Sequence, residues 1–176
     1  MNYPILGYHV SLTEFPEHIS FVIEIGNCLQ QCPECHREDM QTFNQEPMFT
    51  NIVSIEEAVK EAVDKGANGI IIMGGTTNGL LMYDVCILID RLSVYAPVCL
   101  YSGSDNPYKH EIIIKSSNLS ALKTGSYKKE LGGLNSPTTN QRFYLIKKGG
   151  TDYSKVMVDI THKFYDENTN DQPKKR

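Results

Sequence analysis

The chain has 176 residues, of which 40% are hydrophobic and 22% charged, and its formal net charge at pH 7 is −4. This length and composition exclude a disordered chain, because a core of ordinary size can form. The net acidity excludes a general nucleic-acid binder, which needs an excess of cationic side chains to neutralise phosphates. No apolar run approaches the roughly 20 residues that span a bilayer, and the first residues lack the pattern of a signal peptide. We therefore expect a cytoplasmic protein with no membrane partner.

Strand-like and helix-like segments alternate within one predicted domain, residues 1–165, which precedes a polar tail, 166–176, expected to be disordered. Residues 20–25 are rich in β-formers and end at Gly26, which predicts a first strand. Residues 69–73 are wholly apolar, as is typical of a strand buried on both faces of a parallel sheet.

A helix is predicted between these two strands. Ser54 and Glu57 form a capping box at its start, and Gly66 stands where a helix-ending glycine is expected. The apolar positions have the spacing of one helical face: Ile55, Ala58, Val59, Ala62 and Val63.

A second helix is predicted before Pro97, with Leu81, Val85, Leu88, Ile89 and Leu92 on its apolar face. Residues 98–102 form the third predicted strand. We assign 108–118 to a helix, despite three consecutive isoleucines, because a parallel strand at 119–124 needs a crossover. Finally, β-like segments at 142–146 and 156–160 flank a turn region that contains Gly149-Gly150, which predicts a terminal hairpin.

This element order predicts an α/β fold: a small partial (β/α) barrel or an open, mostly parallel sheet, with a C-terminal β-hairpin-like extension. Ligands of such sheets gather at the carboxyl ends of the strands. Three cysteines follow the first strand, Gly74-Gly75 follows the second, and Ser102-Gly103 follows the third. We expect these three loops to meet in one site.

The cysteines carry the chemical signal. An odd total of five argues against a disulfide framework and for metal or redox chemistry. Cys28, Cys32 and Cys35 fall within eight residues of one loop, whereas Cys86 and Cys99 stand in apolar surroundings that predict buried thiols.

Three thiolates on one loop leave two kinds of site open. A structural zinc site needs four ligands, and the fourth would be His36, directly after Cys35. An iron–sulfur cluster held by three cysteines keeps one iron free to bind something else.

The spacing of the cysteines, on the loop after the first strand, resembles the radical S-adenosylmethionine (SAM) superfamily. In that superfamily, a Gly-Gly-acidic stretch after the second strand binds the amino group of SAM. Here Gly74-Gly75 is followed by Thr76, so the carboxylate is missing. A threonine hydroxyl or a backbone carbonyl can still accept a hydrogen bond, without charge assistance.

A second departure is Glu34, where much of the superfamily has an aromatic residue. That position, together with the C-terminal segments 122–127, 130–134, 136–144 and 159–161, resembles one branch: the activating proteins of anaerobic ribonucleoside-triphosphate reductase. The likeness covers most of residues 1–165.

The resemblance implies a glycyl-radical-activating enzyme with a 4Fe-4S cluster on Cys28, Cys32 and Cys35. It implies SAM as the second cofactor, with Gly74, Gly75 and Thr76 at its methionine end, Glu34, Cys35 and His36 near its adenine, and Ser102 at its ribose. No side chain is assigned to catalysis itself. The implied partners are a glycyl-radical enzyme, namely the reductase large subunit, and a low-potential electron donor such as a flavodoxin or ferredoxin.

Two other functions remain open. A small radical SAM enzyme that acts on a free metabolite would share the cysteine loop. A zinc-binding interaction module without catalysis would use the same thiols as structural ligands.

Overall fold

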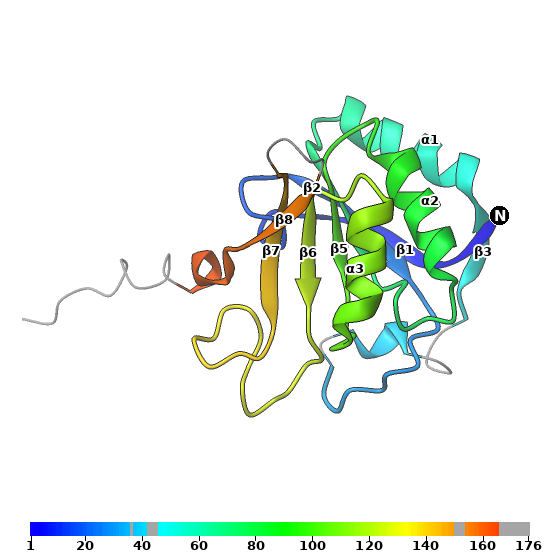
Figure 1. The fold of residues 1–176 in the computed structure, drawn as a ribbon. Helices are drawn as coiled ribbons and strands as arrows, with labels where there is room; N and C mark the ends of the chain where they lie inside the picture. The colour runs from blue at the N-terminus through cyan, green and yellow to red at the C-terminus, as the bar shows by residue number, and fades with distance from the viewer. Residues whose placement is uncertain (36, 42–45, 150–153, 166–176) are drawn as a thin grey trace, which may run out of the picture.

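A computed structural model describes residues 1–35, 37–41, 46–149 and 154–165. The described part forms one eight-stranded sheet and three α-helices (Figure 1). The strands are β1 (Asn2–Ser11), β2 (Ser20–Ile25), β3 (Met48–Asn51), β4 (Gly69–Met73), β5 (Val98–Tyr101), β6 (Ala121–Thr124), β7 (Arg142–Lys148) and β8 (Lys155–Asp159). The helices are α1 (Ile52–Asp64), α2 (Met82–Leu92) and α3 (Pro107–Ser116), with short 3-10 helices η1 (Glu38–Met40) and η2 (Thr161–Phe164).

The strand order across the sheet is β3-β1-β2-β4-β5-β6-β7-β8. The four strands predicted to be parallel are so: β2 pairs with β4, β4 with β5 and β5 with β6. The terminal hairpin is also confirmed, since β7 and β8 are antiparallel neighbours. The expected α/β class holds, but the sheet is mixed rather than mostly parallel. The reason is that β1 and β3, which the sequence analysis did not predict, add antiparallel pairs at one edge.

All three helices lie on one face of the sheet (Figure 1). Alternate strand residues point toward them, and the resulting core contains Ile23, Ile72, Leu100 and Leu122 together with Cys86 of α2. The opposite strand face carries a second, smaller core. Its members include Phe15, Val22, Met40, Ile71, Met73, Cys99, Ala121 and Phe143. Cys86 and Cys99 are therefore buried thiols, as expected.

The start of α1 differs from the prediction, although its end does not. The capping residue is Asn51, whose side chain accepts a hydrogen bond of 3.0 Å from the backbone N–H of Ser54. The helix thus begins before Ser54, and the capping-box assignment was wrong. At the other end Gly66 has φ +109°, and the N–H groups of Gly66 and Ala67 bond back into the last turn, as in a Schellman motif.

The second helix starts later than its apolar pattern indicates. Leu81 is the N-cap residue of α2 and is 69% exposed, so its assignment to the buried face was wrong. The other predicted positions of that face are buried. The isoleucine-rich segment forms α3, as assigned, with Ile113 fully buried. Gly150 of the predicted turn and the predicted tail, 166–176, lie outside the described residues.

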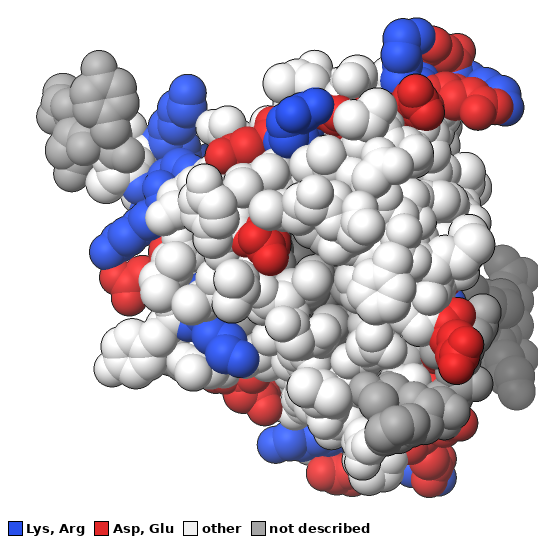
Figure 2. Space-filling model, turned by 90° about the vertical axis from the view of Figure 1, so that its right-hand side faces the viewer, with Lys and Arg blue, Asp and Glu red and all other residues white. Residues whose placement is uncertain are grey.

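One side of the molecule is poor in charge. Figure 2 shows the side that carries β3, the edge strand, with few charged side chains near its centre. Met48 and Phe49 of β3 are 73% and 68% exposed, and Leu29 and Leu81 are similarly exposed. None of the helices within the described ranges is long and apolar enough to span a membrane.

The two candidate caps of α1 can be separated by substitution. We expect Asn51→Ala to lower the free energy of unfolding by about 1 kcal/mol, because it removes the acceptor of an otherwise unpaired helical N–H. Ser54→Ala removes no cap and is expected to change stability by less than about 0.5 kcal/mol. Urea unfolding followed by circular dichroism measures both. A larger loss for Ser54→Ala than for Asn51→Ala would contradict the assignment.

Candidate functional site

The carboxyl ends of β2, β4, β5 and β6 lie at one edge of the sheet, the lower edge in Figure 1. There, as predicted, the three loops meet around one cavity of about 100 Å³. Its lining includes all three loop cysteines, Gly74 and Ser102. Glu34, Gly75 and Thr76 do not line this cavity, and His36 lies outside the described residues.

The cysteine loop has an unusual backbone. Among the described residues, four non-glycine residues have a positive φ, and three of these directly precede the three cysteines: Asn27 (62°), Gln31 (47°) and Glu34 (52°). Left-handed conformations of such residues store strain, which concentrates at functional sites.

Hydrogen bonds fix this loop between β2 and the loop after β4. The N–H of Cys28 donates to the Met40 carbonyl at 2.8 Å, and the N–H of Leu29 donates to the Thr77 carbonyl at 2.9 Å. The Cys28 Sγ lies 3.4 Å from the Thr77 Oγ1. The thiols are thus held at the carboxyl ends of the parallel strands.

Arg37 anchors the far side of the loop to the sheet by ion pairs. Its guanidinium donates to the Glu24 carboxylate and, at 2.7 Å, to the Asp39 Oδ2. Glu24 is a buried residue of β2 whose Oε1 also lies 2.9 Å from the His9 Nδ1. The bonds to Asp39 and Glu24 raise the pKa of Arg37, so it stays charged. Sequence analysis did not identify this cluster.

The loop after β4 depends on its two glycines and on Asn78. Gly74 and Gly75 have φ angles of +99° and +95°, and a Cβ on Gly74 would lie 3.0 Å from the Ile25 carbonyl oxygen. The buried Asn78 side chain accepts a hydrogen bond from the Gly75 N–H at 2.8 Å and donates to the Ile25 carbonyl at 2.8 Å. A single amide therefore locks the end of β2 to this loop.

Thr76 and Ser102 bond to each other rather than facing a ligand. Their hydroxyl oxygens lie 2.7 Å apart, and the Ser102 Oγ is also 2.9 Å from the His110 Nε2 and accepts from the Ser104 N–H at 3.1 Å. Three partners use the full capacity of a hydroxyl. Burial lowers the pKa of His110, which favours its neutral form. This buried chain joins the loops after β4 and β5.

Thr76 lines a neighbouring cavity of about 560 Å³, together with Asp105 and Lys109. The Lys109 Nζ donates to the Thr76 carbonyl at 3.3 Å. Glu34 lies at the surface, where its carboxylate forms an ion pair of 2.5 Å with the Lys129 Nζ. These two predicted residues therefore border the cysteine cavity from outside.

Lys123, at the end of β6, is the most informative residue that sequence analysis missed. It is 8% exposed and lines the cysteine cavity, with its Nζ donating to the Gly125 carbonyl at 3.0 Å. Burial lowers its pKa to about 8, while nearby thiols, including Cys35 and Cys32, favour its charged form. Its position on the strand face shared with Ala121, in a short alternating segment, was a signal that could have identified it.

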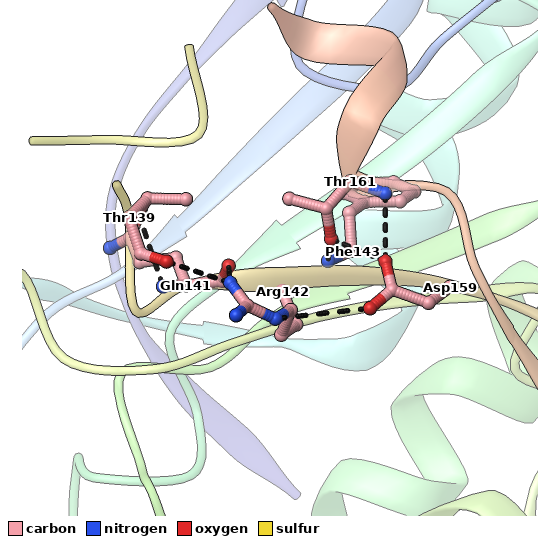
Figure 3. Close-up of polar contacts among 6 residues, drawn as sticks. All are labelled: Thr139, Gln141, Arg142, Phe143, Asp159 and Thr161. Atoms are coloured by element: carbon pink, nitrogen blue, oxygen red, sulfur yellow. Dashed lines mark hydrogen bonds and ion pairs between the residues drawn. The ribbon is translucent and has the colours of Figure 1, made fainter. Parts of the chain in front are cut away.

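A larger cavity of about 680 Å³ adjoins the cysteine cavity. Four residues line both: Tyr101, Lys123, Tyr127 and Gln141. Gln141 is set in place by the C-terminal segment (Figure 3), where its N–H donates to the Thr139 Oγ1 at 3.1 Å.

The remaining contacts in Figure 3 connect β7, β8 and η2. The Arg142 Nη1 donates to the Thr139 carbonyl at 2.7 Å, and the Thr161 hydroxyl links Asp159 to the Phe143 N–H. The polar residues of this segment thus hold the wall of the larger cavity.

Thiolate sulfur, which the three cysteines would supply, is a typical ligand atom of zinc and iron–sulfur sites. Among the described residues, which omit His36, no group of three or more His, Cys, Asp or Glu side chains is arranged to hold a metal ion. A cubane cluster binds each cysteine through a different iron, so its thiolates need to line one cavity rather than meet at one ion. Three thiols line one cavity beside a buried ammonium, which would offset the negative charge of the thiolates in a bound cluster, so these residues fit such a cluster.

The chain was compared with known proteins. No protein-family model, no curated protein and no solved structure matches it.

The burial of Lys123 predicts a pH dependence of stability. Its pKa of about 8 in the folded protein lies below the value of about 10.4 for an unfolded lysine. Between these values the unfolded chain binds more protons, so the contribution of Lys123 to the free energy of unfolding rises with pH. We expect Lys123→Met to be more stable than the wild type at neutral pH, by a margin that shrinks across this window.

Urea unfolding of the metal-free protein at a series of pH values measures that margin. Lys148→Met, on an exposed part of β7, is the matched control for the loss of one lysine charge. A margin for Lys123→Met that stays constant from neutral pH to about pH 10 would contradict the assignment.

Proposed function

We propose that this protein is a radical SAM activating enzyme that generates a glycyl radical on anaerobic ribonucleoside-triphosphate reductase. The observation that carries the proposal is the joint lining of one cavity by Cys28, Cys32 and Cys35, at the carboxyl ends of parallel strands, beside Gly74. We further propose that the parallel strands and their helices correspond to a partial (β/α) barrel. We also propose that the protein is cytoplasmic.

The three cysteines would hold a 4Fe-4S cluster and leave one iron open for SAM. When bound, such a cluster would pass one electron from a low-potential flavodoxin or ferredoxin to SAM, and cleavage of the sulfur–C5′ bond would supply methionine and a 5′-deoxyadenosyl radical. The radical takes a hydrogen atom from a glycine Cα of the reductase. The products would be methionine, 5′-deoxyadenosine and a glycyl radical, with one electron consumed for each radical formed.

The residues of this chain provide position and charge. The Asn78 amide and the glycines keep the loop after β4 against the cysteine loop. Gly74, through its backbone, and the nearby loops would meet the methionine end of SAM. Buried Lys123 would offset the negative charge of a cluster with three thiolates, because charges interact strongly in a site of low dielectric.

A protein substrate suits the surface around the site. Leu29 belongs to the cysteine loop itself, Leu81 begins α2, and Met48 of β3 pairs with Ile5 beside the carboxyl end of β2. These large apolar side chains are exposed, and the side that bears β3 has few charges at its centre (Figure 2). Large exposed apolar side chains near a site are a feature of protein-binding surfaces. A docked reductase would also shield the radical from solvent.

The larger cavity favours one alternative. At about 680 Å³ it has the size of a small-molecule site, and it shares four wall residues with the cysteine cavity. A radical SAM enzyme that acts on a free metabolite would place its substrate there. Such an enzyme would consume SAM in proportion to product, with no protein partner present.

Electron paramagnetic resonance tests the proposal. Anaerobically reconstituted protein, SAM, a reductant and the reductase large subunit are mixed, and the spectrum is recorded. We expect the doublet of a glycyl radical, because the hydrogen atom is taken from a backbone Cα of the partner. Cys32→Ala is expected to abolish the signal, whereas Cys99→Ala, a buried position in the second core, is expected to retain it.

SAM cleavage without any radical on the reductase, in the presence of a metabolite that is turned over, would favour the alternative. A zinc-binding module would show neither cleavage nor radical, whichever partner was added.

A further inference from the structure

Gln30 carries a buried hydrogen-bond acceptor in the wall between the cysteine cavity and the neighbouring cavity lined by Thr76, and the residue lines both. Its side-chain Oε1 is buried and has no hydrogen-bond partner within the described ranges. The residue lies between Cys28 and Cys32 and lines the wall of the cysteine cavity. A buried acceptor without a partner is unfavourable in the folded protein, so a ligand that donates to it gains a hydrogen bond at little desolvation cost.

The neighbouring backbone leaves room for this side chain. At Gly103, after β5, an added Cβ would lie 2.7 Å from the Gln30 Oε1. Any larger residue at this position would displace the amide, so the absence of a side chain at Gly103 sets where the acceptor sits. The fold therefore places the acceptor in the wall of the cavity that the three thiols line.

The loop after β4 offers no acidic side chain to bind a ligand amino group. The loop after β4 has no carboxylate at Thr76, and the Thr76 hydroxyl is bonded to Ser102 and lies outside the cavity lining. A ligand amino group at the cysteines would thus find no acidic partner on this loop. The Gln30 Oε1 is an uncharged acceptor on the same cavity wall.

We propose that the Gln30 Oε1 accepts a hydrogen bond from the α-amino group of SAM and takes the place of the missing carboxylate. This inference rests on the proposed function, in which SAM binds the cluster through its methionine end. A carboxylate ligand group is excluded as the partner, because it carries no donor hydrogen. Gln30 lies between Cys28 and Cys32, which would both hold the cluster. Its amide would therefore be near the methionine part of SAM, which binds the cluster, rather than near the adenine.

Calorimetry on the anaerobically reconstituted protein tests the inference, with SAM and methylthioadenosine as ligands. Methylthioadenosine shares the nucleoside and the sulfur but lacks the amino acid part. We expect Gln30→Met, which keeps length and removes the acceptor, to weaken SAM binding about tenfold and to leave methylthioadenosine binding unchanged. Asn118→Leu is the control: it removes an exposed amide just before β6, at the sheet edge opposite the cysteine cavity, and both affinities are expected to stay at the wild-type value.

A second variant, Gln30→Glu, distinguishes loss of the acceptor from a folding defect in Gln30→Met. It preserves size and an acceptor, so SAM binding is expected to be at least as tight as in the wild type, with iron content unchanged. Unchanged SAM affinity in Gln30→Met, or an equal loss for methylthioadenosine, would overturn the inference while leaving the proposed function standing. A wild-type protein that holds no iron, or that holds iron and does not bind SAM, would overturn both.

Discussion

The parallel pairing of β2, β4, β5 and β6 is the constraint on which the candidate site depends. Parallel neighbours end at the same edge of a sheet, so the loops that follow them are brought together whatever their sequence separation. Asn78 strengthens this arrangement, because one buried amide bonds to both the end of β2 and the loop after β4. Loss of that amide would remove a partner from three backbone groups: the Gly75 N–H and the carbonyls of Ile25 and Gly26.

The cysteine loop combines a strained backbone with an ion pair that fixes it to the sheet. Left-handed residues precede each cysteine, and Arg37 ties the loop to buried Glu24. Buried Lys123 places a cation near the thiols; it forms no salt bridge within the described residues, although the charge of Asp105 favours its protonated form. A negatively charged group bound to the thiolates would attract that ammonium. The buried lysine would thus stabilise the bound group, and the bound group would stabilise the charged lysine.

Hydrophobic pattern was enough to predict the parallel strands and the first two crossover helices, because these elements are buried and periodic. The third helix followed from the need for a crossover, and the terminal hairpin followed from β-forming residues on both sides of a turn, although β8 is largely exposed. It failed for β1, whose sequence includes Pro4 and Gly7 and whose partner β3 is short and exposed. The start of α1 was misplaced because Asn51 and Ser54 are both capable caps, and only the chain path decides between them. The cysteines were predicted to share a cavity and do so. Gln30, Asn78 and Lys123 were missed because their roles arise from contacts between distant segments.

The central claim is that Cys28, Cys32 and Cys35 alone hold an iron–sulfur cluster. Iron and acid-labile sulfide, measured with zinc on anaerobically reconstituted protein, test it most directly. The account predicts about four irons and four sulfides per chain, lost on replacement of any one of the three cysteines by Ala and kept in Cys86→Ala and Cys99→Ala. Stoichiometric zinc without sulfide, or loss of the cluster from a folded Cys86→Ala protein, would contradict it.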